Sequence, residues 1–268
     1  MRILNILRTL TLFIASAALT GNVSGSEERS GEIVLKKGDI VAQQVEGGDW
    51  NVVKVLEVDK WPDGTFTAHC LTYNRTSKKP SLDTVTSLDI YAYHAPIDAS
   101  SFASGWDLIG NSTPKKSELV GFIEYLKLTD FQRYADTTDQ DVKQLIAEAN
   151  RNYKSAIAAG EKGEHKRAIS LYSTAIELFP LFYEAIDNRG FTFMDLGQYD
   201  KALNDFQQSL QVNPNGLTAY FSAGECLLKL GKYEDAMKVF AAGVDKFPER
   251  AELFKDFYSK ALALSKNG

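Results

Sequence analysis

The sequence contains few of the residues that build disulfide frameworks and metal sites. Its 268 residues include 2 cysteines and 3 histidines. Cys70 and Cys226 lie far apart in the chain, which favours two buried free thiols, because a buried cysteine behaves as a small hydrophobic residue. Whether the two cysteines pair stays open. His69, His94 and His165 have no spacing that places two of them on one face of a helix or strand, so we expect no metal ion.

The chain also lacks a strong charge of either sign and lacks the common catalytic motifs. Its 30 Lys and Arg and 35 Asp and Glu give a net charge of -5 without a long basic segment, so nucleic acid is not an expected partner. No Gly-rich phosphate loop, Gly-x-Ser-x-Gly motif or His-Glu-x-x-His motif occurs. His69 and Cys70 are neighbours in a strand-like segment and would point to opposite faces, which argues against a nucleophile and base pair. These absences predict a protein that is not an enzyme and has no cofactor.

The one long apolar run lies at the N-terminus. Arg2 and Arg8 precede an apolar segment at residues 9–19 that is followed by small residues, a pattern typical of a secretory signal peptide. Cleavage after Gly25 would remove residues 1–25, and cleavage after Ala17 is the alternative. We therefore expect an exported protein, either periplasmic or secreted. An uncleaved anchor would need about 20 apolar residues, so membrane contact is expected only through this segment, if it is retained.

From Ala149 to Pro248 the chain repeats itself at intervals of 34 residues. Small residues, turn glycines, alanines, aromatic residues and prolines recur in phase in three successive units. These positions are Ala156, Gly190 and Gly224; Gly163, Gly197 and Gly231; Ala168, Ala202 and Ala236; Tyr172, Phe206 and Phe240; and Pro180, Pro214 and Pro248. The small residues allow helices to approach closely, the turn glycines end one helix and the prolines end the next. The pattern therefore predicts a stack of helical hairpins.

Period and pattern together resemble the tetratricopeptide repeat family. The resemblance predicts repeats at residues 149–182, 183–216 and 217–248, followed by an amphipathic capping helix at 249–266. It also implies that the protein binds another polypeptide in a concave groove, which is lined by the first helix of each repeat. The function expected from this half of the chain is therefore protein–protein interaction.

The same resemblance indicates which residues face the groove. They are Tyr153, Ile157, Glu184, Asp187, Asn188, Phe191, Met194, Phe221, Glu225 and Leu228. This surface is apolar with an acidic edge, which favours an apolar polypeptide segment with basic flanks as its ligand. Alternatively, Phe191 and Phe221 contact a neighbouring element of the same protein, because aromatic residues at helical spacing commonly pack internally. Self-association through the groove is also open.

The N-terminal half has a different pattern. Between residues 33 and 93, short runs of β-branched residues alternate with turns at residues 47–49 and 62–64, which indicates antiparallel strands. The segments 38–42, 48–58 and 63–66 resemble the start of a Tudor-like small five-stranded barrel. Members of that family often hold methylated side chains in an aromatic cage. Trp50 stands at the opening of the second segment, and its alternative role is that of a core residue.

The expected fold class is α+β, with a small antiparallel β-barrel followed by an all-α stack of helical hairpins. We place the barrel at residues 30–98, a partly helical connector at 99–141 and the repeat domain at 142–268. The expected function is that of an exported adaptor or scaffold that binds a polypeptide. One alternative is a hydrolase with a site between the barrel and the repeats, which would use the repeats for substrate docking. The other is an inhibitor or immunity-type protein that neutralises a secreted enzyme.

Overall fold

The computed structural model describes residues 34–266, so the predicted signal peptide at residues 1–25 lies outside the described residues. The chain divides into two compact units, with the boundary between Thr138 and Asp139. We call them the sheet unit and the helical unit. Within residues 34–266, no helix combines the length and the apolar character that crossing a membrane requires.

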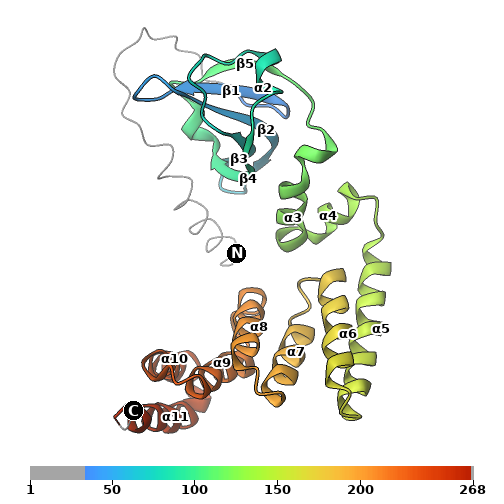
Figure 1. Ribbon diagram of the computed structural model, residues 1–268, viewed down its shortest axis with the longest axis vertical. Helices are drawn as coiled ribbons and strands as arrows, with labels where there is room; N and C mark the ends of the chain where they lie inside the picture. The colour runs from blue at the N-terminus through green and yellow to red at the C-terminus, as the bar shows by residue number, and fades with distance from the viewer. Residues whose placement is uncertain (1–33, 267–268) are drawn as a thin grey trace. The chain divides into compact units, whose positions relative to one another are not determined.

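The sheet unit is built on five antiparallel strands (Figure 1). The strands are β1 (Asp39–Gln44), β2 (Trp50–Lys60), β3 (Phe66–Tyr73), β4 (Ile90–Asp98) and β5 (Asp107–Asn111). Their order in the sheet is β4-β3-β2-β1-β5, so β4 and β5 form its two edges. The predicted α+β class is confirmed, whereas the predicted barrel is an open sheet in the described residues.

The middle of the sheet is covered on both faces. On one face, Val53 and Val55 of β2 pack with Phe102 of the short helix η1 (Ala99–Phe102). On the other face, Val52 packs with Val85 of α2 (Leu82–Val85), and Leu56 packs with residues of α3. Residues 51–56 of β2 are therefore all buried, and they are apolar except for Asn51 and Lys54.

Residues 99–138, most of the segment expected as a connector, lie in the sheet unit. They contain β5, the short helix η2 (Lys116–Glu118), α3 (Val120–Thr129) and α4 (Phe131–Thr137). Strand β5 pairs with β1 and is required to complete the sheet. The sequence does not predict this strand, because it lacks the alternation of apolar and polar residues that marks a strand. Its only large apolar residues are Leu108 and Ile109, and Leu108 is 55% exposed.

Helix α3 lies against the sheet through apolar and charged contacts. Phe122 and Leu126 are buried in one cluster with Leu56 of β2 and Leu71 of β3. Beside this cluster, the Nζ atom of Lys54 lies 2.8 Å from Oε2 of Glu118, and their side chains are 3% and 16% exposed. The contacts fix the start of α3 and its buried face, which positions the polar cluster described below.

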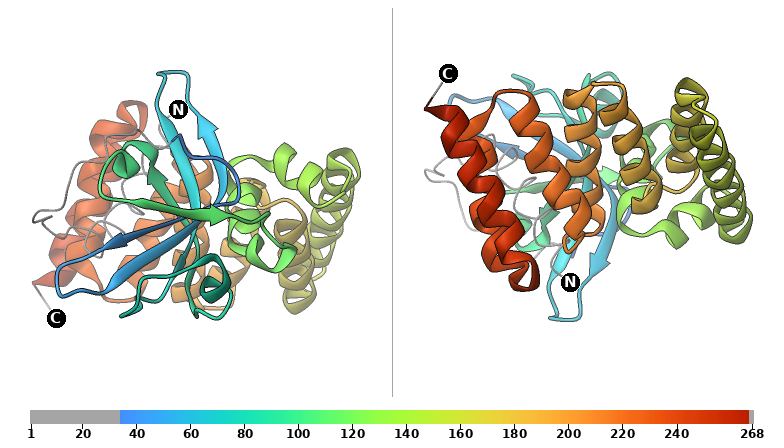
Figure 2. Two further views of the ribbon diagram at one scale, coloured as in Figure 1. Left: turned by 90° about the horizontal axis from the view of Figure 1, so that it is seen from above. Right: turned by 90° about the horizontal axis from the view of Figure 1, so that it is seen from below.

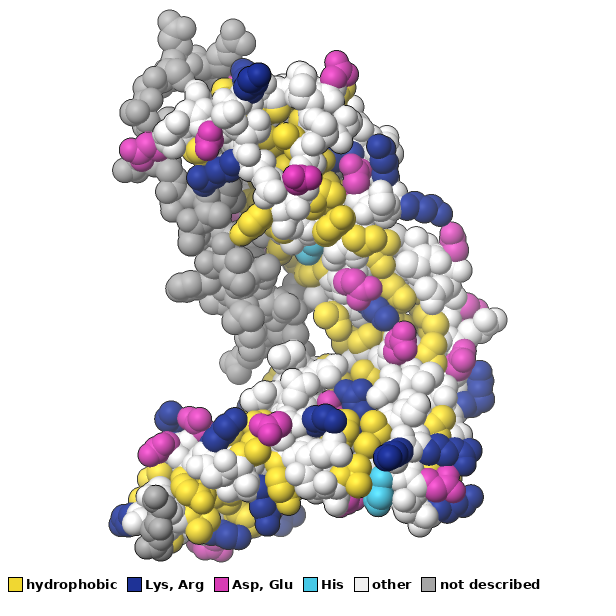
Figure 3. All heavy atoms as spheres, viewed as in Figure 1, with side chains coloured by type: hydrophobic (Ala, Val, Ile, Leu, Met, Phe, Trp, Pro, Cys, Tyr) yellow, Lys and Arg dark blue, Asp and Glu magenta, His cyan; other side chains and the backbone are white. Residues whose placement is uncertain are grey.

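The helical unit consists of seven α-helices and one short 3-10 helix within the described residues. They are α5 (Val142–Glu161), α6 (His165–Leu178), α7 (Tyr183–Asp195), α8 (Tyr199–Val212), α9 (Leu217–Lys229), α10 (Tyr233–Lys246), η3 (Pro248–Arg250) and α11 (Ala251–Ser265). Figure 2 shows helices of this unit side by side in chain order, and each α-helix contacts the next. On the face shown in Figure 3, acidic and basic side chains are interspersed over this unit.

The repeated positions have the structural roles that their spacing predicts. Gly163, Gly197 and Gly231 follow the first helices of the three hairpins with φ angles of 73°, 68° and 73°. These angles lie in the left-handed region, which glycine enters without steric cost. The repeated alanines and aromatic residues of α6, α8 and α10 are buried between helices. The predicted hairpin stack is therefore confirmed.

Gly224 allows α9 to lie close to α10, and its replacement by alanine tests this contact. A Cβ atom at Gly224 would lie 2.6 Å from Cε1 of Phe240, whose side chain is fully buried. We expect Gly224→Ala to destabilise the helical unit by about 1 to 2 kcal/mol, because overpacking exceeds the gain in helix propensity. Gly160→Ala is the matched control, since a Cβ atom there would meet no atom within 4 Å. Urea denaturation followed by circular dichroism measures both, and equal effects would contradict the packing role of Gly224.

Cys70 and Cys226 are both buried and free. Cys70 lies in β3 among the apolar residues of the sheet unit, and Cys226 lies in α9 within the core of the helical unit. Burial raises the pKa of both thiols, that of Cys226 to about 12. Their positions in the interiors of two different units match two buried thiols rather than a disulfide.

Candidate functional site

The predicted groove residues lie on α5, α7 and α9, the first helices of the three hairpins. We call their common surface the first-helix face. Glu184 is exposed and Leu228 is buried, at 9% exposure. The other members are half-buried, namely Tyr153, Ile157, Asp187, Asn188, Phe191, Met194, Phe221 and Glu225. Every predicted residue except Leu228 is therefore accessible to a ligand.

Tyr153 and Asn188 connect the first two hairpins on this face. Nδ2 of Asn188 donates a hydrogen bond of 2.9 Å to the hydroxyl oxygen of Tyr153, which joins α7 to α5. The Tyr153 ring also packs on Phe182, with ring centroids 4.8 Å apart. The structure thus brings together two residues that were predicted from separate repeats, and Asn188 already uses its amide group in an internal contact.

Asp187 is a partly buried acidic residue of the first-helix face. Its Oδ1 atom is buried and accepts no hydrogen bond within the described residues. Burial raises the pKa of this carboxyl group, and the neighbouring carboxylates of Glu184 and Asp205 raise it further, against a hydrogen bond with Ser209. Asp187 therefore lies where negative charge is insufficiently compensated, and a cationic group would be stabilised beside it.

The other end of the face is covered in part by the capping helix. The Phe221 ring contacts Phe254 and Phe257 of α11, with centroids 5.7 and 4.7 Å apart. Burial raises the pKa of Glu225, and the charges of Lys260 and Lys229 oppose this shift. Phe257 and Lys260 were missed because the repeat pattern ends before α11. The amphipathic pattern of the cap was the only sequence signal for them.

Both aromatic residues of the predicted groove also contact rings of this protein. Besides the contacts of Phe221, the Phe191 ring meets the edge of Phe206, with centroids 5.1 Å apart. Internal packing, the alternative considered for these residues, is therefore present, although both side chains stay half-exposed.

A charged pair lies behind the first-helix face. Nε and Nη2 of Arg189 donate to the two carboxylate oxygens of Asp205 at 2.8 and 2.7 Å, and Nη1 donates to Oγ of Ser173 at 3.0 Å. The side chains of Arg189 and Asp205 are 17% and 3% exposed. The pair connects α6, α7 and α8 and so fixes the helix that carries Glu184 and Asp187.

A second polar cluster lies in the sheet unit, under α3 and α4. Nη1 of Arg133 lies 2.8 and 2.9 Å from the two carboxylate oxygens of Asp59, and Oδ2 of Asp59 lies 3.0 Å from Nε2 of His69. Nδ1 of His69 in turn lies 2.9 Å from Nε2 of His94. We call these four residues the histidine cluster. They come from four elements, α4, β2, β3 and β4.

The histidine cluster is enclosed by aromatic rings. Phe122 and Tyr125 of α3 each pack against both imidazoles, with centroid distances between 4.6 and 5.7 Å. Burial and the neighbouring charge of His69 lower the pKa of His94 to about 3. Burial raises the pKa of Asp59, but hydrogen bonds and charges of His69 and Arg133 outweigh it, so the net shift is downward. Asp59 is therefore held as a carboxylate.

Sequence spacing could not predict this cluster. His69 pairs with Pro96 across β3 and β4, so His94 is its diagonal neighbour on the same face of the sheet. The expectation concerned spacing within one helix or one strand, so it did not cover this contact between two strands. In residues 34–266 no group of three His, Cys, Asp or Glu side chains is arranged to hold a metal ion.

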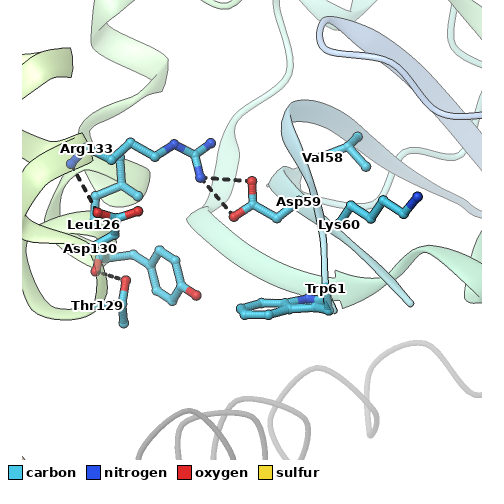
Figure 4. Close-up of a pocket in the computed structure, with 9 residues that line it drawn as sticks. Val58, Asp59, Lys60, Trp61, Leu126, Thr129, Asp130 and Arg133 are labelled. Atoms are coloured by element: carbon cyan, nitrogen blue, oxygen red, sulfur yellow. Dashed lines mark hydrogen bonds and ion pairs between the residues drawn. The ribbon is translucent and has the colours of Figure 1, made fainter. Parts of the chain in front are cut away.

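A cavity of about 340 Å³ lies next to the histidine cluster (Figure 4). It is lined by Val58, Asp59, Lys60, Trp61, Tyr125, Leu126, Thr129, Asp130 and Arg133. Asp59 and Arg133 belong to both the cavity and the histidine cluster. All these residues lie within the sheet unit, so the cavity is distinct from the first-helix face.

Trp50, the candidate cage residue, is half-buried and packs with the cluster around Ile40 and Val52. Nζ of Lys79 lies 5.1 Å from the centroid of its ring, so a cation of this protein is already placed there. Trp50 thus combines the core role with an internal cation–π contact.

Comparison with known proteins identifies the helical hairpins. Residues 189–251 match the tetratricopeptide repeat family. Together with the period of 34 residues and the confirmed hairpins, this match identifies residues 189–251, from α7 to the start of α11, as tetratricopeptide repeats. Domains of this kind are protein–protein interaction modules. No curated protein matches the chain.

Among solved structures, similar chains are tetratricopeptide repeat domains. The complex of the TPR2B domain of yeast Sti1 with pHsp70 is 20% identical, with a TM-score of 0.41, and the match covers 44% of this chain and 98% of that chain. The Arabidopsis OM64 domain is 19% identical, with a TM-score of 0.40 and coverages of 43% and 98%. The first repeat domain of Spaghetti (RPAP3), bound to the HSP90 peptide SRMEEVD, is 21% identical, with a TM-score of 0.40 and coverages of 44% and 95%.

Proposed function

We propose that this protein is an exported, non-enzymatic adaptor that binds an apolar polypeptide segment with basic flanks on its first-helix face. The observation that carries the proposal is Asp187, whose buried Oδ1 atom accepts no hydrogen bond from residues 34–266 and whose pKa is raised by burial and by the nearby Glu184 carboxylate. A Lys or Arg side chain of a partner would supply both a donor and the missing positive charge.

The apolar part of the ligand would lie along the half-exposed rings of the same face. Tyr153 and Phe191 flank the acidic end, and Phe221 continues the surface toward α11. Rigid aromatic side chains supply contact area at low entropic cost, which suits them to anchor a polypeptide. The chemistry of this face therefore favours an apolar segment next to a basic residue.

An acidic C-terminal peptide does not fit the same surface. Such a ligand would place its carboxylates next to Glu184, Asp187 and Glu225, and like charges at an interface disfavour binding. Asn188, which matches one position of the carboxylate clamp found in some family members, already donates its amide to Tyr153.

Export is proposed from the N-terminal sequence pattern, in which Arg2 and Arg8 precede the apolar segment at residues 9–19. In the periplasm or outside the cell, the partner would be another exported polypeptide or a second copy of this chain. The interaction experiment therefore uses the chain without residues 1–25.

A pair of synthetic peptides tests the proposed ligand chemistry. One carries a central apolar segment of Leu and Phe flanked by Lys, and its twin carries Glu in place of each Lys. In fluorescence polarisation we expect the Lys peptide to bind and the variant Glu184→Lys/Asp187→Asn to weaken it about tenfold or more. Glu184 is exposed, so its replacement leaves the hairpin packing intact.

Glu177→Lys is the matched control, because Glu177 is an exposed acid on α6, the second helix of a hairpin. It makes the same acid-to-lysine change as Glu184→Lys, but away from the first-helix face, and should leave binding unchanged. Equal binding of the Lys and Glu peptides, or equal loss in the control, would refute the proposed site. Sedimentation of the protein alone separates self-association from peptide binding.

A further inference from the structure

The cavity in the sheet unit shares no lining residue with the first-helix face. It lies between the end of β2 and the two helices α3 and α4. Its volume of about 340 Å³ is at the lower end of the range of about 300 to 1,000 Å³ that ligand pockets occupy. The cavity is therefore large enough for a small ligand, and its side chains indicate the chemistry of that ligand.

The charges around the cavity are balanced internally. Asp59 and Arg133 form an ion pair within it, at 2.8 and 2.9 Å, so neither charge is left without a counter-charge. Asp130 caps α4 by accepting a hydrogen bond from the backbone N–H of Arg133. Nζ of Lys60 lies 5.7 Å from the centroid of the Phe66 ring, and Figure 4 shows this side chain directed away from Arg133. A net charge on the ligand would disturb this balance, which favours a neutral ligand.

One wall of the cavity is a fixed aromatic ring. Nε1 of Trp61 donates a hydrogen bond of 2.8 Å to Oγ1 of Thr67, which holds the indole in place. Figure 4 shows the Trp61 ring extending from the end of β2 toward Thr129, the last residue of α3, and Asp130, which caps α4. Trp61 is half-buried, so part of this ring is accessible. An indole face of this kind binds a flat array of C–H groups.

The polar groups of the cavity match hydroxyl groups. The carboxylates of Asp59 and Asp130 accept hydrogen bonds, and the guanidinium group of Arg133 and the phenol of Tyr125 donate them. A hydroxyl group both donates and accepts, so several hydroxyls on one ring can satisfy this mixed set. The Asp59 carboxylate is fixed from behind by His69, which keeps the polar wall preorganised.

We propose that this cavity binds a neutral saccharide unit, with the C–H face of the sugar on Trp61 and its hydroxyls on Asp59, Arg133, Tyr125 and Asp130. A sugar ring has an apolar face that fits the Trp61 ring and a rim of hydroxyls that fits the polar groups. It carries no charge, so it leaves the ion pair of Asp59 and Arg133 undisturbed. The proposal rests on the sheet unit alone and is independent of polypeptide binding by the repeats.

Isothermal titration calorimetry of residues 26–268 tests the proposal. The probes are glucose, galactose, mannose, N-acetylglucosamine, cellotetraose and chitotetraose, each raised to millimolar concentration. We expect at least one to bind saturably, and Trp61→Ala to weaken it about tenfold or more through loss of the stacking surface. Trp61→Tyr, which keeps an aromatic ring, should retain part of the affinity.

Two further variants separate loss of the site from loss of the fold. Trp106→Phe is the matched control, since Trp106 packs on Phe102 away from the cavity and its replacement should leave binding unchanged. Thr129→Phe adds a ring at the cavity wall and should abolish binding even if Trp61→Ala fails to fold. The proposal is overturned if no saccharide binds, or if binding survives Trp61→Ala and Thr129→Phe. It is also overturned if tetramethylammonium or inorganic phosphate binds this cavity more tightly than every saccharide.

Discussion

Replacement of Asp205 by alanine is expected to lower the free energy of unfolding of the helical unit by about 3 to 5 kcal/mol. The reason is that the guanidinium group of Arg189 on α7 would stay buried against α6 and α8 without a counter-charge. Asp205 accepts two hydrogen bonds from Arg189, at 2.8 and 2.7 Å, and its side chain is 3% exposed. Removal of one partner from such a pair costs more than the pair itself contributes, because the other charge stays desolvated.

Urea denaturation followed by far-ultraviolet circular dichroism measures this loss. Asp200→Ala is the matched control on the same helix, because Asp200 is 78% exposed and lies 3.9 Å from Lys232. It should change the stability by less than about 1 kcal/mol. In the double variant Arg189→Leu/Asp205→Leu the desolvated charge is absent, so stability should recover toward the wild type. A loss in Asp205→Ala no larger than in Asp200→Ala would contradict this account.

The repeats could be predicted from the sequence because their determinants are local and recur. Each hairpin needs a small residue at the crossing of its helices, a glycine after the first helix and a proline near the end of the second, and these are visible at a fixed spacing. The buried Phe206 and Phe240 show that the repeated aromatic position is a core position. The pairing of Arg189 with Asp205 was not predictable in this way, since periodicity does not specify which charges meet between helices.

The sheet unit was predicted less completely because its determinants are nonlocal. The central strand β2 was evident from its apolar run, whereas β5 is short and half-exposed and becomes a strand only through pairing with β1. The histidine cluster depends on diagonal contacts between strands and on the docking of α3 and α4. The cavity also depends on nonlocal packing, because Trp61 and Arg133 come to line it only when α3 and α4 pack on the sheet.

The candidate binding face lies between these two cases. The positions of Tyr153, Glu184 and Asn188 followed from the repeat register, and the structure places them on accessible surface. The contacts of Phe257 and Lys260 with this face were missed, because the capping helix lies outside the repeats and its residues cannot be aligned with repeat positions. Leu228 was assigned to the groove and is buried, since the third hairpin packs against both of its neighbours.

Acid is expected to destabilise the sheet unit selectively, through the histidine cluster. The pKa of His94 is lowered to about 3, from a reference value near 6.5. Between these values the unfolded chain binds a proton that the folded chain does not, so the free energy of unfolding falls as the pH falls. The slope for one such group is at most about 1.4 kcal/mol per pH unit, which amounts to about 2 to 4 kcal/mol between pH 6.5 and pH 3. The lowered pKa of Asp59 acts in the same direction below its reference value.

Two carboxyl groups of the helical unit should contribute to its acid response in the opposite sense. The pKa values of Asp187 and Glu225 are raised by burial, so these carboxyl groups bind protons more readily in the folded state. Their protonation therefore offsets part of any acid destabilisation of the repeats. The two units should respond differently to the same change of pH.

The two units can be monitored separately, because Trp50, Trp61 and Trp106 are the only tryptophans of the chain and all lie in the sheet unit. Urea denaturation at pH 7 and pH 4 should show a lower midpoint at pH 4 in tryptophan fluorescence and a smaller change in circular dichroism. His94→Gln removes the titrating group, so the pH dependence of the fluorescence midpoint should become weaker. His165→Gln, a histidine substitution in the helical unit, should leave it unchanged. If His94→Gln keeps the full pH dependence, the acid sensitivity arises outside the pairing of His94 with His69.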